Sequence, residues 1–280
     1  MTNLRPRTIL MPVIESGAKR DNENAVPAGA TSILRNLRQR PKLLVSVRSV
    51  GEANRALEGG VDILDVKDPS RGSLGMASIN DITAIASLGP VSSRTILLSV
   101  ALGEVVDWNS SQIDLALPSD ITFAKLGLSQ CAQKADWKAE WLSVRKAVQR
   151  QSSSKLNWVA VAYADLAEAN SPSVADVLAA AIETDCVGLL IDTWTKDGRT
   201  LLDGLDDKSI TTIANDCHKA GLFLAVAGKL SHQSLQRLAS VPVDVVAIRS
   251  AACVGTDRTL ELDPRRVTDF QTEMRRCFVL

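Results

Sequence analysis

The chain contains little histidine, no even set of cysteines and no excess of either charge. Its 280 residues include only 2 His, and its 5 Cys are widely spaced. Neither residue type forms a metal-ligand pattern, so we expect no metal site and no disulfide framework, and we interpret the cysteines as reduced thiols. The 32 basic and 32 acidic residues give a formal net charge of zero. This balance gives no reason to expect nucleic acid as a partner.

Long hydrophobic runs and nucleotide-binding motifs are also absent. No apolar stretch approaches the ~20 residues that span a bilayer, and the apolar run 9–14 is too short and contains a proline, unlike the core of a signal peptide. We therefore expect a cytoplasmic protein with no membrane partner. No G-x-G-x-x-G sequence follows the first expected strand, and no Walker A sequence is present, which argues against a doubly wound dinucleotide fold. We expect no cofactor.

Residues 1–41 differ in composition from the rest of the chain. They are rich in Arg, Asn, Pro and Gly, and their apolar residues follow no sustained period. This composition predicts a flexible N-terminal extension, with one short helix at 32–38. An oligomerisation or targeting arm is the alternative interpretation.

From residue 42 to residue 280, short apolar runs alternate with amphipathic segments. The expected strands are 43–47, 63–67, 95–102, 121–127, 157–163, 187–192, 222–227 and 245–249. Their nearly continuous hydrophobicity is typical of parallel strands buried on both faces. Between them, apolar residues recur at helical spacing, as at Trp137, Trp141, Val144 and Val148. Eight strands with eight following helices predict an α/β fold, a single (β/α)8 TIM barrel forming one catalytic domain.

Charged residues interrupt two of these apolar strands near their C-terminal ends, where barrels of this kind hold their active sites. Alternation in strand 63–67 turns Asp65 and Lys67 toward the barrel interior, which predicts that they form a pair. Lys125 lies in strand 121–127, two residues before Gly127. The alternative is a buried ion pair that only fills a layer of the core.

A third group of charges follows the sixth expected strand, where Asp192 ends the strand and Lys196 lies on the next loop. Lysines gathered at the mouth indicate an anionic or carbonyl ligand. Burial and a neighbouring ammonium both lower the pKa of a lysine, so one member of the group can be neutral and attack a carbonyl to form an imine. A second lysine can then transfer protons, while Asp65 and Asp192 keep the remaining cations ionised.

The loops after the last two strands are the usual phosphate site of these barrels. They carry Gly228, Lys229 and Ser231, then Arg249 and Ser250. Glycine allows close approach of the backbone to phosphate, and Arg249 could grip phosphate with two hydrogen bonds. The alternative is that Arg249 and Lys229 are solvated surface charges.

A second glycine-bearing segment, with Gly72 and Ser73, follows strand 63–67. We expect it to order over a second anion, although an ordinary mobile loop would have the same composition.

At these residues the sequence resembles a known family, the (5-formylfuran-3-yl)methyl phosphate synthases, also called 4-(hydroxymethyl)-2-furancarboxaldehyde-phosphate synthases. The resemblance extends from about Lys42 to at least Arg258, and the segment around Lys67 is its most specific part. The motifs that carry it are Asp65-Val66-Lys67-Asp68-Pro69, Gly72-Ser73-Leu74-Gly75, Phe123-Ala124-Lys125-Leu126-Gly127, Asp192-Thr193 with Lys196-Asp197-Gly198, and Val246-Ala247-Ile248-Arg249. One departure is that Lys229 and Ser231 have exchanged places relative to the family pattern.

The resemblance implies a barrel lyase of methanofuran biosynthesis. Such an enzyme joins two molecules of glyceraldehyde 3-phosphate and releases phosphate and water to leave a furan aldehyde phosphate. By this resemblance Lys67 is the imine-forming lysine and Lys125 the general base, with Asp65, Asp192 and Lys196 as supporting charged residues.

Two other functions remain open for this sequence. A class I aldolase acting on another phosphosugar would use the same imine chemistry without making a furan. A non-catalytic barrel that binds a phosphometabolite would need no lysine with a lowered pKa. For the triose phosphate enzyme we expect a homo-oligomer, although the residues themselves do not determine the assembly.

Overall fold

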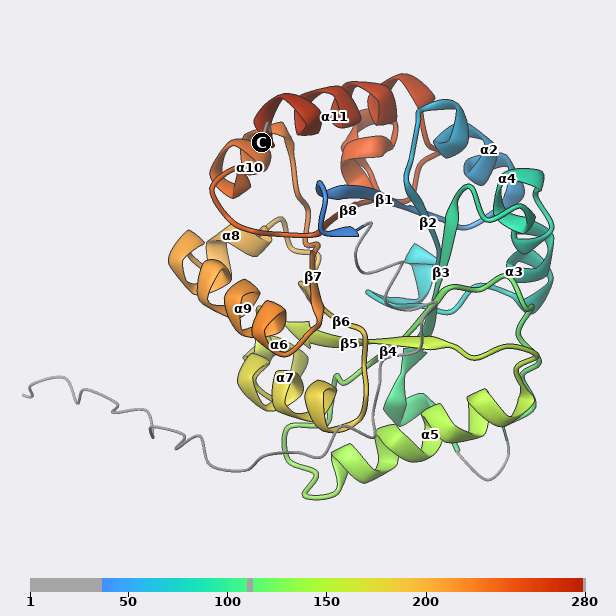
Figure 1. Ribbon diagram of the computed structural model, residues 1–280, viewed down its shortest axis with the longest axis vertical. Helices are drawn as coiled ribbons and strands as arrows, with labels where there is room; N and C mark the ends of the chain where they lie inside the picture. Colours follow the sequence, from blue (N-terminus) through green and yellow to red (C-terminus); the bar gives the residue numbers. More distant parts are fainter. Residues whose placement is uncertain (1–36, 110–112, 279–280) are drawn as a thin grey trace, which may run out of the picture.

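The computed structural model describes residues 37–109 and 113–278. Its eight strands pair in parallel with their neighbours in chain order and close into a barrel, so the predicted TIM barrel is confirmed (Figure 1). The strands are β1 (Lys42–Val47), β2 (Ile63–Val66), β3 (Leu97–Glu104), β4 (Phe123–Gly127), β5 (Asn157–Tyr163), β6 (Gly188–Asp192), β7 (Phe223–Val226) and β8 (Val245–Ile248). All eight expected strands are present, and only β3 is displaced, two residues toward the C-terminus.

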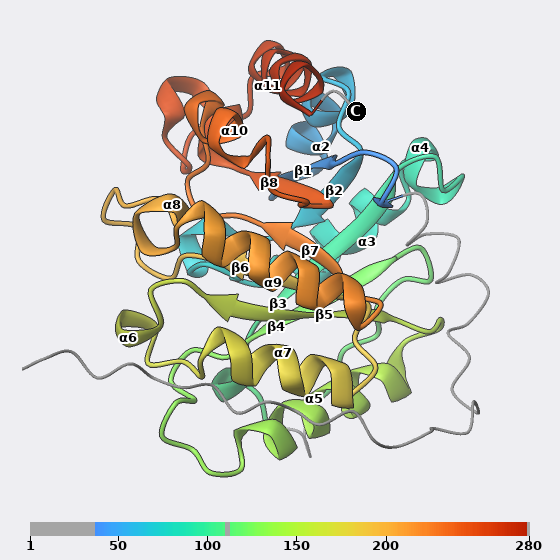
Figure 2. The same ribbon diagram turned by 60° about the vertical axis from the view of Figure 1, so that its left-hand side comes forward.

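Helices surround the barrel on its outside (Figures 1 and 2). They are α2 (Val50–Glu58), α3 (Ile79–Ala86), α4 (Gly89–Ser92), α5 (Trp137–Gln151), α6 (Leu166–Ala169), α7 (Val174–Glu183), α8 (Leu201–Gly204), α9 (Asp207–Lys219), α10 (His232–Leu238) and α11 (Pro264–Cys277). The described residues also form four short 3-10 helices: η1 (Pro69–Arg71), η2 (Val105–Asp107), η3 (Ser250–Ala252) and η4 (Val254–Thr256).

The connection from β3 to β4 departs from the expected pattern of eight following helices. Its described residues, 105–109 and 113–122, contain the 3-10 helix η2 and no α-helix. Across the whole described part of the chain, no helix has both the length and the apolar character needed to cross a membrane.

The chain just before β1 packs against the end of the barrel opposite its mouth. Leu37 is only 1% exposed and joins the cluster of side chains inside the barrel, and the guanidinium of Arg38 donates to the carbonyl of Leu222 at 3.0 Å. Most of the helix expected at 32–38 and most of the expected flexible extension fall in residues 1–36, which lie outside the described residues.

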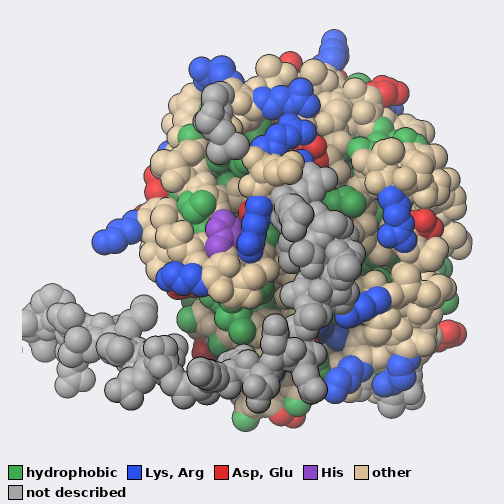
Figure 3. Space-filling view, viewed as in Figure 1, with side chains coloured by type: hydrophobic (Ala, Val, Ile, Leu, Met, Phe, Trp, Pro, Cys, Tyr) green, Lys and Arg blue, Asp and Glu red, His purple; other side chains and the backbone are tan. Residues whose placement is uncertain are grey.

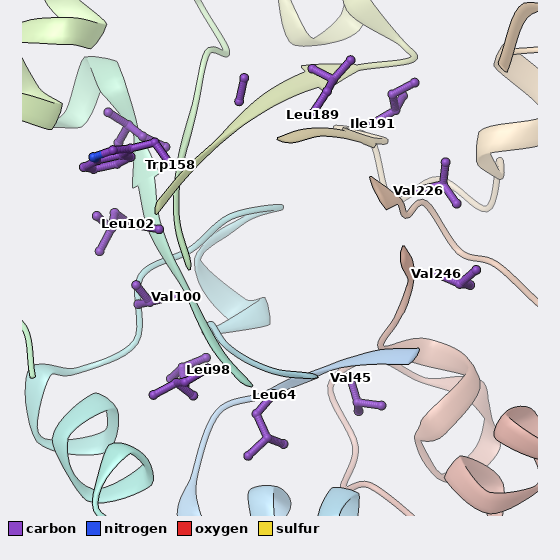
Figure 4. Packing of buried hydrophobic residues seen from close by; sticks show 14 of the residues in the cluster. Val45, Leu64, Leu98, Val100, Leu102, Trp158, Leu189, Ile191, Val226 and Val246 are labelled. Carbon is purple, nitrogen blue, oxygen red and sulfur yellow. The ribbon is translucent and has the colours of Figure 1, made fainter. Parts of the chain in front are cut away.

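Side-chain alternation along the strands divides the core into two layers, as the pattern of β2 predicts. Leu64 and Val66 belong to the outer cluster, between the strands and the helices. Figure 4 shows Leu64 with Val45 and Val246 on the outer side of their strands. Ile63 belongs to the inner cluster, together with residues such as Phe223. The same alternation therefore directs Asp65 and Lys67 to the interior.

The molecular surface shows no single charged region on the face drawn in Figure 3. Lys and Arg side chains lie singly or in small groups over several elements. This distribution agrees with the zero formal charge of the chain.

Candidate active site

A cavity of about 240 Å³ opens at the C-terminal ends of the strands and extends into the barrel. Its lower walls are apolar and include Leu44, Phe123 and Phe223, whereas its upper walls are charged. The structure brings together here all five residues that the sequence suggested for catalysis, namely Asp65, Lys67, Lys125, Asp192 and Lys196. Small side chains of β7 and β8, Ala225 and Ala247, leave the space open on one side.

Asp65 and Lys125 form a buried ion pair between β2 and β4. The ammonium of Lys125 donates to Oδ1 of Asp65 at 2.5 Å, and the hydroxyl of Ser46 donates to Oδ2 at 3.2 Å. Burial alone would raise the pKa of Asp65, but the charges of Lys125 and Lys67 and the donated hydrogen bonds outweigh it, so the pKa lies below its ordinary value. The predicted pairing of Asp65 with Lys67 is wrong, because the ion pair of Asp65 is formed with Lys125.

Lys67 extends from the end of β2 into the cavity, enclosed by protein atoms except on the cavity side. Its ammonium donates to the carbonyl of Ser73 at 3.1 Å. Burial and, to a smaller extent, the nearby ammonium groups of Lys125 and Lys196 lower its pKa to about 8, although the charges of Asp192 and Asp65 partly oppose this shift. With this pKa about one Lys67 amine in ten is neutral at pH 7, far more than for a lysine with the ordinary pKa of 10.5.

Asp192 and Lys196 lie on the opposite side of the cavity from the Asp65–Lys125 pair. Asp192, at the end of β6, accepts hydrogen bonds from the backbone N–H of Thr193 at 2.8 Å and from the hydroxyl of Ser73 at 3.1 Å. The ammonium of Lys196 is 3.8 Å from Oδ1 of Asp192. Burial would raise the pKa of Asp192, but Lys196, Lys67 and these donors hold it below its ordinary value.

The loop after β2, residues 68–75, forms a strap across the mouth of the barrel. Ser73 is 2% exposed and Leu74 is 1% exposed, and Leu74 packs into the inner cluster. The hydroxyl of Ser73 is bonded to Asp192, and neither Gly72 nor Ser73 lines the cavity. The expectation that these two residues bind an anion is therefore corrected, because the strap has folded onto β6.

Of the five residues in the loops after β7 and β8 that were expected to bind phosphate, three line the cavity and form no ion pair with a described residue, although the ammonium of Lys229 also donates to the carbonyl of Gly198 at 3.1 Å. Gly228 and Lys229 follow β7, and Ser250 follows β8. Gly228 has a φ of +107°, and a side chain there would meet Thr193 and Leu201, so the turn requires glycine. Ser231 instead caps α10, where its hydroxyl accepts from the backbone of Ser234, and it does not line the cavity.

Arg249 lines the cavity but binds protein rather than offering its donors to a ligand. Its guanidinium forms a two-pronged ion pair with Glu52 of α2, with one bond, from Nη2 to Oε1, of 2.9 Å. The remaining donors bind the carbonyls of Ser46, Arg258 and Leu260. Arg249 is 8% exposed, and the predicted grip on phosphate is wrong because Glu52 already occupies that fork.

Arg258 was not recognised from the sequence as a site residue, although it lies within the region of family resemblance. Its Nη2 donates to the carbonyls of Pro69 and Gly72 in the strap at 3.2 and 3.0 Å, and its Nε is buried without a hydrogen-bond partner. Arg258 lines the cavity and forms no salt bridge with any described carboxylate. Burial lowers the pKa of this guanidinium. A half-buried cation without a carboxylate partner is suited to an anionic ligand.

A buried acid that the sequence did not point to lies at the end of β3. A register shift between Ala101 and Glu104 marks a bulge, and Gly103 within it has a φ of +77°. The Glu104 carboxylate accepts from the hydroxyl of Tyr163 on β5 at 2.6 Å and from the backbone of Ser129 at 2.8 Å. Burial raises the pKa of Glu104. These bonds join β3, the loop after β4, and β5.

Comparison with known proteins identifies relatives over most of the barrel. The family model described as 4-HFC-P synthase matches residues 43–271. The (5-formylfuran-3-yl)methyl phosphate synthase of Methanothermobacter thermautotrophicus is 33% identical over 220 residues, which are 77% of this chain and 91% of the relative. The protein of the same name from Methanopyrus kandleri is 32% identical over 222 residues, 78% of this chain and 92% of the relative.

Solved structures resemble the chain in fold alone. Thiamine phosphate pyrophosphorylase from Pyrococcus furiosus has a TM-score of 0.54 at 13% identity, covering 87% of this chain and 100% of its own. KGPDC from Streptococcus mutans has a TM-score of 0.52 at 14% identity, covering 86% of this chain and 100% of its own.

Proposed function

The chain belongs to the 4-HFC-P synthase family, and on that premise we propose that it is a lyase that condenses two molecules of glyceraldehyde 3-phosphate into (5-formylfuran-3-yl)methyl phosphate. Phosphate and water leave during the reaction, and the product serves the biosynthesis of a methanofuran-type cofactor. The observation that carries the proposal is Lys67, an amine with a pKa of about 8 that faces a cavity between two acid–base pairs. Such an amine is a competent imine-forming nucleophile near neutral pH.

In the proposed reaction the neutral amine of Lys67 attacks the carbonyl carbon of one triose phosphate. The carbinolamine loses water to give an imine, which makes the neighbouring carbon acidic. Lys125 transfers protons at that carbon and at the leaving oxygen, since its ammonium is held on Asp65 at 2.5 Å and faces the cavity. Asp192 and Lys196 stabilise charge on the opposite side of the cavity, where the second triose phosphate would be joined.

The phosphate groups would lie against the loops after β7 and β8. Gly228, Lys229 and Ser250 line this side of the cavity, and Arg258 adds a guanidinium with no carboxylate partner among the described residues. Two phosphate esters must be accommodated during the condensation, and one of them departs as inorganic phosphate. We assign the stronger anion contact to Arg258 because its charge is partly desolvated and forms no salt bridge with a described carboxylate.

The test is incubation of the purified chain with glyceraldehyde 3-phosphate while furan absorbance and phosphate release are recorded. Wild-type protein should produce both signals together, and Lys67→Ala should produce neither. Lys138→Ala is the matched control, because Lys138 lies on the surface of α5 in an exposed ion pair with Glu183. Phosphate release or aldol products without furan absorbance would instead favour an aldolase acting on another phosphosugar.

Borohydride added during turnover tests the imine itself. Reduction should fix the triose phosphate carbon skeleton on Lys67, seen as a mass increase on the peptide that contains this residue. An adduct on another lysine, or no adduct while furan forms, would contradict the proposed role of Lys67.

A further inference from the structure

The strap that crosses the mouth of the barrel begins directly after Lys67. Its neck is closed by a hydrogen bond from the backbone N–H of Asp68 to the carbonyl of Gly75 at 2.8 Å. Leu74 anchors its far end, because its side chain is buried in the inner cluster and its carbonyl accepts from the backbone of Gly103 at 2.8 Å. The strap is therefore held at both ends, and Ser73 lies between these anchors.

Ser73 contacts three of the charged residues that surround the cavity. Its hydroxyl is 3.1 Å from Oδ2 of Asp192, 3.0 Å from the carbonyl of Thr193 and 3.3 Å from the ammonium of Lys196. Its own carbonyl accepts from the ammonium of Lys67 at 3.1 Å. The backbone carbonyl of this buried serine thus bonds the expected nucleophile. Its side chain bonds a carboxylate and a second ammonium.

The hydroxyl bridges a gap that the two charges do not close by themselves. The ammonium of Lys196 lies 3.8 Å from the Asp192 carboxylate, which is too long for a direct hydrogen bond. Through Ser73 the same two groups are joined by contacts of 3.3 and 3.1 Å. The hydroxyl accepts from Lys196 and can donate its single hydrogen to Asp192 or to the Thr193 carbonyl.

Resting on the function proposed above, we propose that Ser73 is a positioning residue that holds Asp192 and Lys196 apart and fixes both relative to the amine of Lys67. The charged groups that act on Lys67 are Asp65 of its own strand, Lys125 of β4, and Asp192 and Lys196 at the end of β6. Among these four groups, Ser73 bonds directly to Asp192 and Lys196. Its hydroxyl therefore controls how strongly the Asp192 carboxylate attracts the ammonium of Lys67.

Removing this hydroxyl has a defined electrostatic consequence. In Ser73→Ala the carbonyl that bonds Lys67 is retained and Lys196 keeps its bond to the carbonyl of Thr193 at 2.5 Å, but Asp192 loses a donor and Lys196 loses one of its acceptors. Lys196 then closes directly on Asp192, which neutralises the carboxylate and weakens its attraction for the Lys67 ammonium. We expect the pKa of Lys67 to fall by about half a pH unit.

The experiment measures the titration of Lys67 without using substrate. The whole protein is labelled with trace acetic anhydride across a pH series, and acetylation of the peptide containing Lys67 is quantified by mass spectrometry. Wild type, Ser73→Ala and Ser73→Thr are compared, with Ser70→Ala as a matched control, because the exposed Ser70 hydroxyl in the same strap bonds only to Asp68. Thermal melting of each variant is recorded in parallel.

A downward shift of the Lys67 titration in Ser73→Ala, with wild-type behaviour in Ser73→Thr and Ser70→Ala, is the expected result. A Ser73→Ala protein whose Lys67 titrates as in wild type would overturn the proposal, whether or not its melting temperature changes. Failure of wild type to make a furan from glyceraldehyde 3-phosphate would sink the proposed function, whereas the labelling result would still decide the role of Ser73.

Discussion

Replacing Lys67 with Met should stabilise the protein while abolishing imine formation. The folded-state pKa of Lys67, about 8, lies well below the ordinary lysine value of 10.5. The difference means that the folded protein holds the protonated amine at a cost of about 3 kcal/mol relative to the unfolded chain. A Met side chain of similar length carries no charge to desolvate, so the variant escapes this cost.

The sign of the effect follows from proton linkage. Because the folded-state pKa is the lower one, the unfolded chain binds more protons between pH 8 and pH 10.5, and stability rises with pH across that range. Below pH 8 both states of the wild type are protonated, and the full cost of about 3 kcal/mol is present. Above pH 10.5 both states are neutral, and the advantage of the Met variant disappears.

Urea unfolding of wild type and Lys67→Met at pH 7, pH 9 and pH 10.5 measures this difference. We expect a gain of about 3 kcal/mol in unfolding free energy at pH 7 that declines toward zero at the highest pH. Lys138→Met is the control, since this exposed lysine should change stability by less than about 0.5 kcal/mol. A Lys67→Met protein that is less stable than wild type at pH 7, or whose gain does not vary with pH, would refute the reasoning.

Three further substitutions separate the other charged groups. Asp65→Asn leaves the Lys125 ammonium buried without a carboxylate, so we expect the free energy of unfolding in urea to fall by about 3–5 kcal/mol. A fall of less than about 1 kcal/mol would contradict the importance of the buried Asp65–Lys125 ion pair. Arg258→Ala should raise the inhibition constant of inorganic phosphate about tenfold or more, in assays with glyceraldehyde 3-phosphate as substrate. Arg249→Ala should instead lower the free energy of unfolding in urea by about 3–5 kcal/mol, because it leaves the buried Glu52 carboxylate without its ion-pair partner. If Arg249→Ala weakened phosphate inhibition and left stability unchanged, Arg249 and not Arg258 would be the arginine that binds phosphate.

The barrel and the inward position of the charges could be predicted because a strand buried on both faces is a nearly continuous run of apolar residues. Asp65, Lys67 and Lys125 interrupt otherwise apolar runs, and two-residue alternation fixes the face on which they lie. The partner of each charge could not be predicted in this way. Which lysine reaches Asp65 depends on the stagger of β2 relative to β4, and this stagger is a property of the closed barrel.

The two arginines at the mouth show a second limit of sequence reasoning. A cation at the end of a buried strand suggests a ligand, but Arg249 is bound by Glu52, which lies 197 residues away in the chain. Arg258 lies in a loop after β8, where no strand pattern singles it out in the sequence. Only its partial burial without a salt bridge to a described carboxylate distinguishes it from a surface arginine. Composition and spacing contain no information on either contact.

Lys67 owes its lowered pKa chiefly to burial, and the cavity walls around it come from strands on all sides of the barrel, so this pKa depends on the whole ring of strands being closed. On a nascent or unfolded chain this lysine is an ordinary protonated side chain that reacts poorly with sugar aldehydes. The same holds for any fragment that ends before β6, because part of the wall that buries Lys67 and the Asp192 carboxylate that bonds Ser73 are then missing. We therefore expect Lys67 to acquire its lowered pKa only when the barrel has closed during folding, and to lose it when proteolysis opens the barrel.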